Sequence, residues 1–237
     1  MSLVATVAGP NSNSYLTVTE ADAYFTGRSD TSNWDALSTS DKEALLIQST
    51  KDVDIGANYG GEPYYDAQKL QFPRDDVDSV EGNCASVAND RFKHSDLKSD
   101  TYMEIPNNFY KYGSIHFTSA TLENQVYAIA SSNTSGFVFA SFSATPTTTT
   151  QFIVFPPIDK DIKDAVCEQA YSTNEYKLGN YAEMRALGLY NVRIGDVSVT
   201  TRIPREPSSA RTPVLCLKAR RLISRFSRGS VDRVARA

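Results

Sequence analysis

Apolar and polar positions near the start of the chain follow the period of a helix. Thr17 stands three residues before Glu20, so its hydroxyl can accept a hydrogen bond from the third helical amide. The glutamate can reach back to the Thr17 amide, which completes a capping box. The pattern predicts a helix that begins near Val18.

A second helix is expected shortly after the first. Ser40 stands three residues before Glu43, and apolar residues follow at helical spacing, so either Ser38 or Ser40 is expected to begin it. The loop between the two helices carries Trp34. The opening therefore predicts a pair of short helices that bury an apolar seam and offer no nucleophile.

The middle of the chain changes to a strand-like pattern between about residues 75 and 155. It is rich in Ser, Thr, Asn and aromatic residues, and four runs are typical of strands: 114–118, 125–130, 136–142 and 151–155. About four strands are enough for a small sheet with a core. We expect the aromatic residues of this region to be core residues: Phe137, Phe139, Phe142, Phe152 and Phe155.

Helical periodicity returns after Pro156-Pro157. Apolar and small residues from Ile162 to Thr173 form one stripe, which predicts a helix of about five turns that begins near Asp159 or Asp161 and extends through Lys177. A further helical turn or two is expected over 181–187.

The C-terminal part is predicted to begin with a hairpin. Residues 191–194 and 197–201 flank Gly195-Asp196, a dipeptide that suits a two-residue turn. A proline-rich stretch follows, and a last helix is expected from Val214 to about Phe226.

These elements together predict an α+β fold. We expect a small helical bundle with an inserted β subdomain, a β-hairpin and a basic C-terminal arm. The expected divisions are 1–74 for the first part of the helical domain, 75–155 for the inserted β subdomain, 156–201 for the second part of the helical domain with the hairpin, and 202–237 for the arm.

Charge is unevenly distributed along the 237 residues, whose formal net charge is −4. From Arg202 onward there are ten basic and two acidic residues. A basic segment on an acidic body is typical of proteins that bind an acidic partner, either a protein or a nucleic acid.

The sequence gives no support for membrane association, for metal or cofactor binding, or for catalysis. No run approaches the ~20 apolar residues that span a bilayer, so no membrane association is expected. The three cysteines lie far apart and the two histidines stand alone, so we expect no metal site and no cofactor. Asp75-Asp76 and the Asp159/Asp161 pair lack further ligands, and no phosphate loop or nucleophile elbow is present. We therefore expect no catalytic residue and no enzymatic activity.

Taken in order, four segments resemble the head-to-tail adaptor, or head completion, proteins of tailed bacteriophages, a family also called DnaT-like single-stranded DNA-binding. The segments are the opening motif 13–25, Phe72-Pro73-Arg74, residues 158–170 and the hairpin 194–199. The resemblance covers residues 11–74 and 156–202. The long β insertion and the long basic arm depart from the pattern of the family, so their roles cannot be carried over.

The resemblance implies a structural component of the virion neck, assembled in the host cytoplasm. Copies of such a protein form a ring of about twelve that joins the portal to the next neck or tail protein. Genomic DNA passes through the channel of the ring without specific binding.

For the basic arm we hypothesise docking on an acidic portal surface, with arginines pairing to carboxylates and an apolar helix face filling a groove. The alternatives are a solvated arm and arginines that contact passing DNA. The candidate portal-binding residues are Arg202, Arg205, Arg211, Leu215, Lys218, Arg220, Arg221, Leu222, Arg225 and Phe226.

Single-stranded DNA binding is the alternative function. Four aromatic residues are candidates for a surface on which bases stack: Tyr59, Tyr64, Tyr65 and Phe72. They stand among acidic residues, which oppose phosphate. The β insertion is expected either to have no binding role or to contact neighbouring capsid or neck subunits. A role in binding sugars or a host surface is the less favoured alternative.

Overall fold

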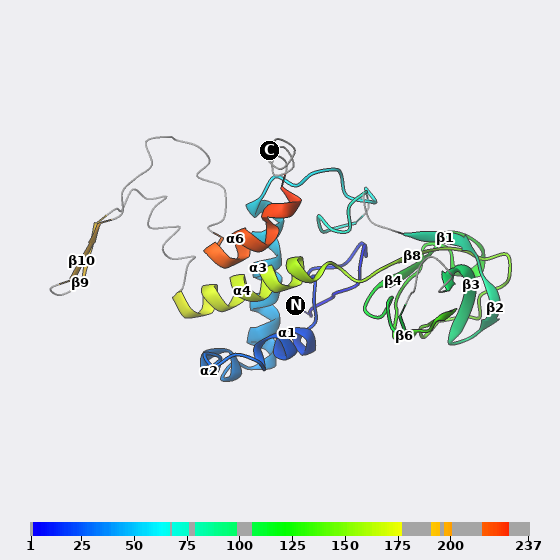
Figure 1. Cartoon of the computed structure of the whole chain (residues 1–237), viewed down its shortest axis with the longest axis horizontal. Helices are drawn as coiled ribbons and strands as arrows, with labels where there is room; N and C mark the ends of the chain where they lie inside the picture. The colour runs from blue at the N-terminus through cyan, green and yellow to red at the C-terminus, as the bar shows by residue number, and fades with distance from the viewer. Residues whose placement is uncertain are drawn as a thin grey trace, which may run out of the picture. The chain divides into compact units, whose positions relative to one another are not determined.

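The structure is a computed structural model, and it describes residues 2–66, 68–75, 79–98, 106–176, 191–194, 197–200 and 215–227. The fold is α+β, as the sequence predicts. The chain divides into two compact units (Figure 1). The helical unit contains Leu16–Gly60 and Asp161–Ala237, and the β unit contains Ser2–Tyr15 and Gly61–Lys160.

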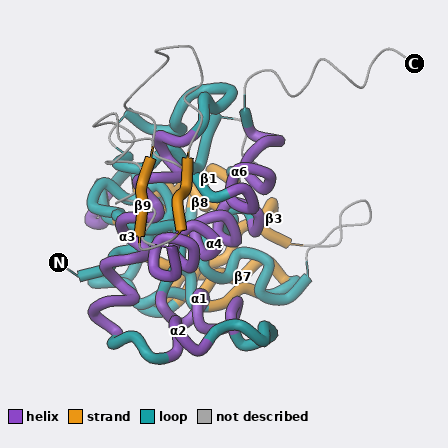
Figure 2. Tube along the Cα trace, turned by 90° about the vertical axis from the view of Figure 1, so that its left-hand side faces the viewer, coloured by secondary structure: helices purple, strands orange, loops and turns teal. Residues whose placement is uncertain are grey.

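The helical unit contains the helices drawn in purple in Figure 2. They are α1 (Val18–Phe25), α2 (Ser32–Asp35), α3 (Thr39–Gly56), α4 (Lys160–Tyr176) and α6 (Leu217–Ile223), followed by the 3₁₀ turn η2 (Ser224–Phe226). The predicted long helix is therefore confirmed as α4, and the predicted last helix is confirmed as α6 with η2.

Local capping residues begin the first helices. The Thr17 hydroxyl accepts from the Glu20 amide at 3.2 Å, and the Glu20 carboxylate accepts from the Thr17 amide at 2.8 Å. The predicted capping box is thus confirmed. At α3 the N-cap is Ser38, whose hydroxyl accepts from the Asp41 amide, and Ser40 lies inside the helix.

The core of the helical unit forms around Trp34, the one tryptophan of the chain. Its ring lies 4.6 Å from that of Phe25, centroid to centroid, and neither side chain is exposed by more than 1%. The indole N–H donates to Asp22 at 2.9 Å, so the one polar atom of the ring is satisfied. Cys167 on α4 is also buried in this unit.

The β unit contains two four-stranded antiparallel sheets. The first has the order β1 (Val80–Asn83), β8 (Gln151–Phe155), β4 (Ser114–Phe117) and β5 (Val126–Ala128). The second has the order β2 (Ala85–Ala88), β3 (Arg91–Lys98), β7 (Ser135–Phe139) and β6 (Ser131–Ser132). A 3₁₀ turn, η1 (Ala120–Leu122), follows β4.

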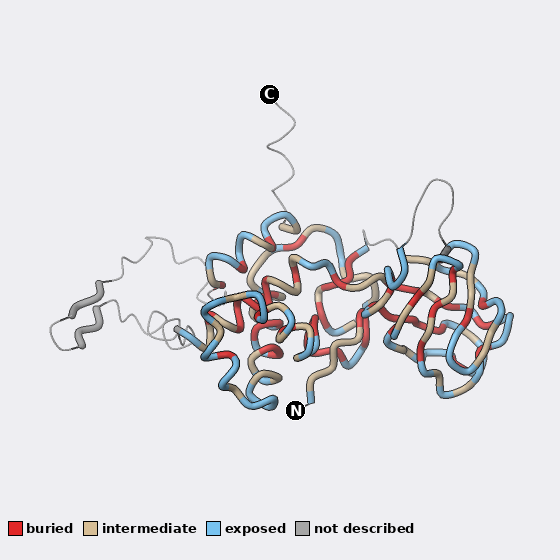
Figure 3. The backbone as a smooth tube through the Cα atoms, turned by 60° about the horizontal axis from the view of Figure 1, so that its bottom comes forward, coloured by how far each residue is buried: buried red, intermediate tan, exposed pale blue. Residues whose placement is uncertain are grey.

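Side chains from both sheets form one apolar core, within the buried segments drawn red in Figure 3. Phe92 of β3 and Val138 of β7 meet Phe117 and Phe152 from the other sheet. Phe152 and Phe155 are buried as predicted. Phe137 and Phe139 are half-buried and lie outside the core, so the prediction that they are core residues is wrong. Phe142 is half-buried but packs against the core, with its ring 5.4 Å from that of Phe117, centroid to centroid.

The N-terminal segment belongs to the β unit, whereas the sequence assigned residues 1–74 to the helical domain. The Val7 carbonyl accepts from the Ser114 hydroxyl at 2.7 Å and from the His116 ring at 3.1 Å. Tyr15 packs edge-on against Phe72, and its hydroxyl accepts from the Phe72 amide. These contacts between β4, the first residues and the Phe72 segment explain the difference from the predicted boundary.

A hairpin follows in the chain, as predicted. β9 (Asn191–Ile194) pairs with β10 (Val197–Thr200), with Ile194 opposite Val197. The turn residues 195 and 196, the helical turn expected over 181–187, and the proline-rich stretch lie outside the described residues.

Candidate functional site

The C-terminal helix α6 is anchored firmly in the helical unit. The Cys216 sulfur caps the helix by accepting from the Ala219 amide at 3.4 Å, and the Cys216 amide donates to Gln169 of α4 at 2.8 Å. Leu215 is 4% exposed and occupies space that a side chain at Gly56 of α3 would fill. The Gly60 amide donates to the Phe226 carbonyl at 3.0 Å. Helix α6 therefore lies against both α3 and α4 (Figure 1).

This anchoring leaves one face of α6 and η2 exposed. The face carries four cationic side chains, which we call the α6 cationic surface: Lys218, Arg220, Arg221 and Arg225. Arg225 pairs with Asp161 at 3.1 Å, and its guanidinium lies 4.6 Å from the Phe226 ring centroid. Neither Arg220 nor Arg221 has an ion-pair partner in the part of the chain that the structure describes. The surface is therefore able to receive an anionic ligand.

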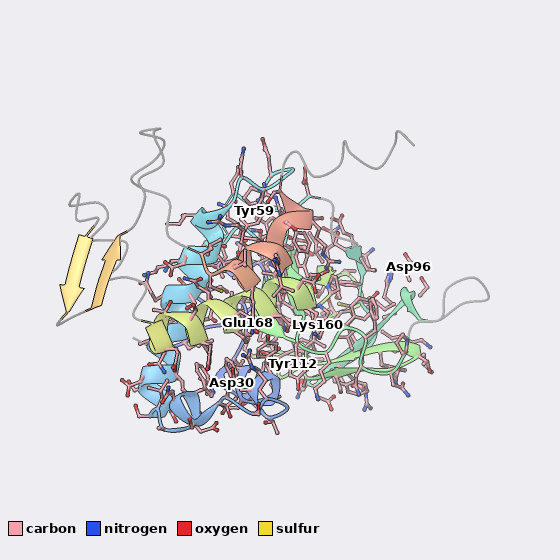
Figure 4. All side chains as sticks on the ribbon, turned by 60° about the vertical axis from the view of Figure 1, so that its left-hand side comes forward. Asp30, Tyr59, Asp96, Tyr112, Lys160 and Glu168 are labelled. Atoms are coloured by element: carbon pink, nitrogen blue, oxygen red, sulfur yellow. The ribbon has the colours of Figure 1, made fainter. Side chains whose placement is uncertain are left out.

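Beneath this surface lies a cluster around Glu168, labelled on α4 in Figure 4. The carboxylate is 8% exposed and accepts from the Tyr24 hydroxyl at 2.6 Å. The Arg28 guanidinium pairs with it at 2.5 Å, and the Lys218 ammonium lies 3.5 Å away. Burial, and then the hydrogen bond to Glu168, raise the pKa of Tyr24 well above its usual value. The cluster connects α1, α4 and α6, and its role is to position the helices.

The predicted portal-binding residues divide into four groups. Lys218, Arg220, Arg221 and Arg225 are exposed, while Leu222 and Phe226 are half-buried. Leu215 is buried inside the unit, which corrects the expectation that it fills a groove on a partner. The remaining three, Arg202, Arg205 and Arg211, lie outside the described residues.

The aromatic residues proposed to stack bases do not form an open surface. Tyr59 is 5% exposed and donates to the Val53 carbonyl at 2.6 Å. Phe72 is 8% exposed, and the Tyr65 ring stacks on His116 with centroids 5.3 Å apart. Tyr64 packs against Phe155. The stacking role is therefore wrong for Tyr59 and Phe72, which are buried, while Tyr64 and Tyr65 are half-buried with rings that pack against Phe155 and His116.

Among the described residues, the cysteines and aspartates considered for catalysis or metal binding are buried or already paired within the protein. Burial raises the pKa of the Cys84 thiol to about 12 and raises that of Cys167 further, so both thiols are protonated at neutral pH and poor nucleophiles. Asp75 accepts from the Glu62 amide, and Asp161 pairs with Arg225. Within the described residues no three His, Cys, Asp or Glu side chains gather as a metal site would need. No helix in this part of the chain is long and apolar enough to cross a membrane.

Residues 1–90 match the model of a family described as "Putative DnaT-like ssDNA binding protein". No curated protein matches the chain. The match covers α1 to α3, the Phe72 segment, and β1 with β2. It gives no support to the phage adaptor function that the resemblance implies.

Sequence reasoning missed two features of these surfaces. The first is the Glu168 cluster, since Glu168 lies off the apolar stripe of α4 and nothing near it in the chain marks its partners. The second is the pair of half-buried rings on β7. Their position beside the cations of β3 depends on how the two strands pair, which the sequence does not show.

Proposed function

We propose that this chain is a non-enzymatic protein that binds single-stranded DNA, with the α6 cationic surface providing phosphate contacts. The observation that carries the proposal is the match of residues 1–90 to a family described by that activity. Helix α6 lies outside the matched residues, but it packs directly on α3, which lies inside them. The part of the matched segment that forms α1 to α3 thus belongs to the same unit as the cations of α6.

The charges of the surface suit a polyanion. Arg220 and Arg221 are exposed and have no carboxylate partner among the described residues, so binding phosphate costs them no existing ion pair. Phosphate contacts release condensed counterions, which makes affinity fall steeply with salt. Such contacts carry no sequence information. We therefore propose binding that depends on salt and tolerates any base sequence.

Reversing two charges tests this proposal. The Arg220→Glu/Arg221→Glu variant is expected to bind an oligothymidylate at least about 10-fold more weakly, and the slope of log K against log salt should decrease by about 1.4. Fluorescence anisotropy over a salt series measures both quantities. The control is Lys51→Glu/Lys69→Glu, which makes the same change in net charge at two other exposed lysines. Equal weakening by both variants would indicate a general charge effect and contradict the proposal.

A head-to-tail adaptor of a bacteriophage neck is the second candidate function. Leu217 at the start of α6 is 62% exposed, and it stands beside the cations. An exposed apolar side chain next to unpaired arginines is typical of a protein-docking surface. We propose that, in this function, the same surface docks on an acidic portal and that copies of the chain form a ring.

Co-sedimentation with the cognate portal tests the second candidate. The Arg220→Glu/Arg221→Glu/Arg225→Glu variant should lose association with the portal, because like charges would then face each other across the interface. Lys51→Glu/Lys69→Glu should associate normally. Unchanged co-sedimentation of the triple variant would exclude this surface as the portal contact.

A further inference from the structure

The sheet formed by β2, β3, β7 and β6 has one face in the core and one face turned outward. Along β7, Val138 points into the core and is fully buried. Phe137 and Phe139 flank it and, because strand side chains alternate, both lie on the opposite face. They are half-buried, and their ring centroids lie 6.3 Å apart. This face therefore carries two neighbouring phenyl rings that the core does not enclose.

Two cations stand directly beside these rings on the adjacent strand. The register pairs Arg91 with Phe139 and Lys93 with Phe137, so all four side chains share the outer face. The Lys93 ammonium lies 5.3 Å from the Phe137 ring centroid. Among the described residues neither Arg91 nor Lys93 has an ion-pair partner, so both charges are available to a ligand.

The rings and Arg91 line a shallow depression on this face. Its other walls are the residues 86–88 of β2 and Asn133, and no carboxylate is among its lining residues. The Asn133 side-chain oxygen already accepts from the amides of Ser135 and Phe137, each at 3.1 Å. The depression thus offers flat apolar surfaces and positive charge, with little capacity to select a particular base by hydrogen bonds.

We infer that this outer face binds single-stranded nucleic acid, with bases stacking on Phe137 and Phe139 and phosphates pairing with Arg91 and Lys93. Stacking on a phenyl ring suits every base, and each stacked base strengthens binding. A duplex keeps the faces of its bases covered, so it cannot use the rings. A four-stranded sheet with exposed aromatic residues on a central strand is a known way to hold single strands. The inference rests on the proposed function for the identity of the ligand.

The positive charges of Arg91 and Lys93 make a neutral sugar or an apolar partner a poor ligand for this face. A neutral sugar would need acceptors and donors around the rings, whereas the lining offers one cation, Arg91, and an amide whose oxygen is already used. An apolar partner would leave Arg91 and Lys93 unpaired at the interface, which is costly. A chain of planar bases joined by phosphates satisfies both the rings and the cations.

A tryptophan placed at the site provides a direct readout of stacking. The natural Trp34 is fully buried, so its emission is a constant background. In a Phe137→Trp variant of the full chain, an oligothymidylate of about 16 nucleotides should quench the added emission on binding, and a duplex of equal length should not. Phe109→Trp, at a 45% exposed phenylalanine that does not line the depression, is the matched control and should not be quenched.

Affinity measurements by anisotropy complete the test. Phe137→Ala/Phe139→Ala is expected to weaken binding at least about 10-fold, while Phe137→Tyr/Phe139→Tyr should keep it, since tyrosine also stacks. Arg91→Glu/Lys93→Glu should weaken binding, and Lys51→Glu/Lys69→Glu should not. Circular dichroism confirms that each variant is folded.

The outcomes separate this inference from the proposed function. If the wild-type chain binds no oligonucleotide, both fail. If binding depends on Arg220 and Arg221 but is unchanged by Phe137→Ala/Phe139→Ala, and Phe137→Trp is not quenched, only the inference is overturned. Quenching by an oligosaccharide and not by DNA would likewise overturn it.

Discussion

Replacing Phe92 by alanine is expected to lower the free energy of unfolding of the β unit by about 3–5 kcal/mol. Phe92 has no exposed surface, and its ring lies 4.5 Å from Phe152 and 6.1 Å from Phe117, centroid to centroid. These two neighbours come from the other sheet. Loss of the ring therefore opens a cavity where the two sheets meet. Urea unfolding followed by far-ultraviolet circular dichroism measures the change.

The matched control is Phe137→Ala, one strand away on the opposite face of the same sheet. Phe137 is half-buried and lies outside the core, so we expect its loss to cost less than about 1 kcal/mol. Equal destabilisation by the two substitutions would contradict the assignment of an inner and an outer face. It would also remove the basis for an accessible pair of rings on β7.

Replacing Glu168 by alanine is expected to destabilise the helical unit by about 3 kcal/mol. The carboxylate pairs with Arg28 at 2.5 Å and accepts from the Tyr24 hydroxyl at 2.6 Å. Its removal leaves the guanidinium with less compensation in a site where its side chain is 18% exposed. The remaining water contact of Arg28 keeps the effect at the lower end of the range for broken buried pairs. Emission of Trp34 during urea unfolding measures the change, because Trp34 belongs to this unit.

Two further substitutions isolate the cause. Glu175→Ala removes an exposed carboxylate from the same helix and should cost less than about 1 kcal/mol. Glu168→Gln keeps the shape and a hydrogen-bond acceptor for Tyr24, so its cost should lie between the two. A Glu168→Ala variant as stable as Glu175→Ala would show that the cluster does not hold the helices together.

Local signals in the sequence were sufficient to predict several helices and strands. The capping box at Thr17 fixes the start of α1, and the apolar run 151–155 coincides with β8. The Gly195-Asp196 dipeptide correctly separates β9 from β10. In each case the information lies within a few residues of the element, so no tertiary contact is needed to read it.

Strands β1 to β3 escaped prediction for a physical reason. In β3 the buried residues Phe92 and Leu97 stand five positions apart, and the pairing with β7 shifts register between Lys93 and Lys98. The irregularity breaks the alternation by which a strand is recognised. The segment therefore resembles a charged loop until it is paired with β7.

The candidate binding surfaces could likewise be predicted only in part from the sequence. The cations of α6 were identified from the sequence because charge is a local property. The rings of Phe137 and Phe139 were not, since Tyr64 and Tyr65 have the same local character in the sequence. All four side chains are half-buried, and their surroundings differ: Tyr65 stacks on His116, whereas Phe137 lies on the outer face of its sheet.

The most direct test of the central claim is a titration of the wild-type chain with a labelled oligothymidylate and with a duplex of equal length, over a series of salt concentrations. We predict binding to the single strand that is tighter than binding to the duplex and that weakens steadily as salt rises, because both phosphate contacts and stacking contribute. Absence of binding to the single strand at low salt, or equal affinity for the two ligands, would contradict the claim.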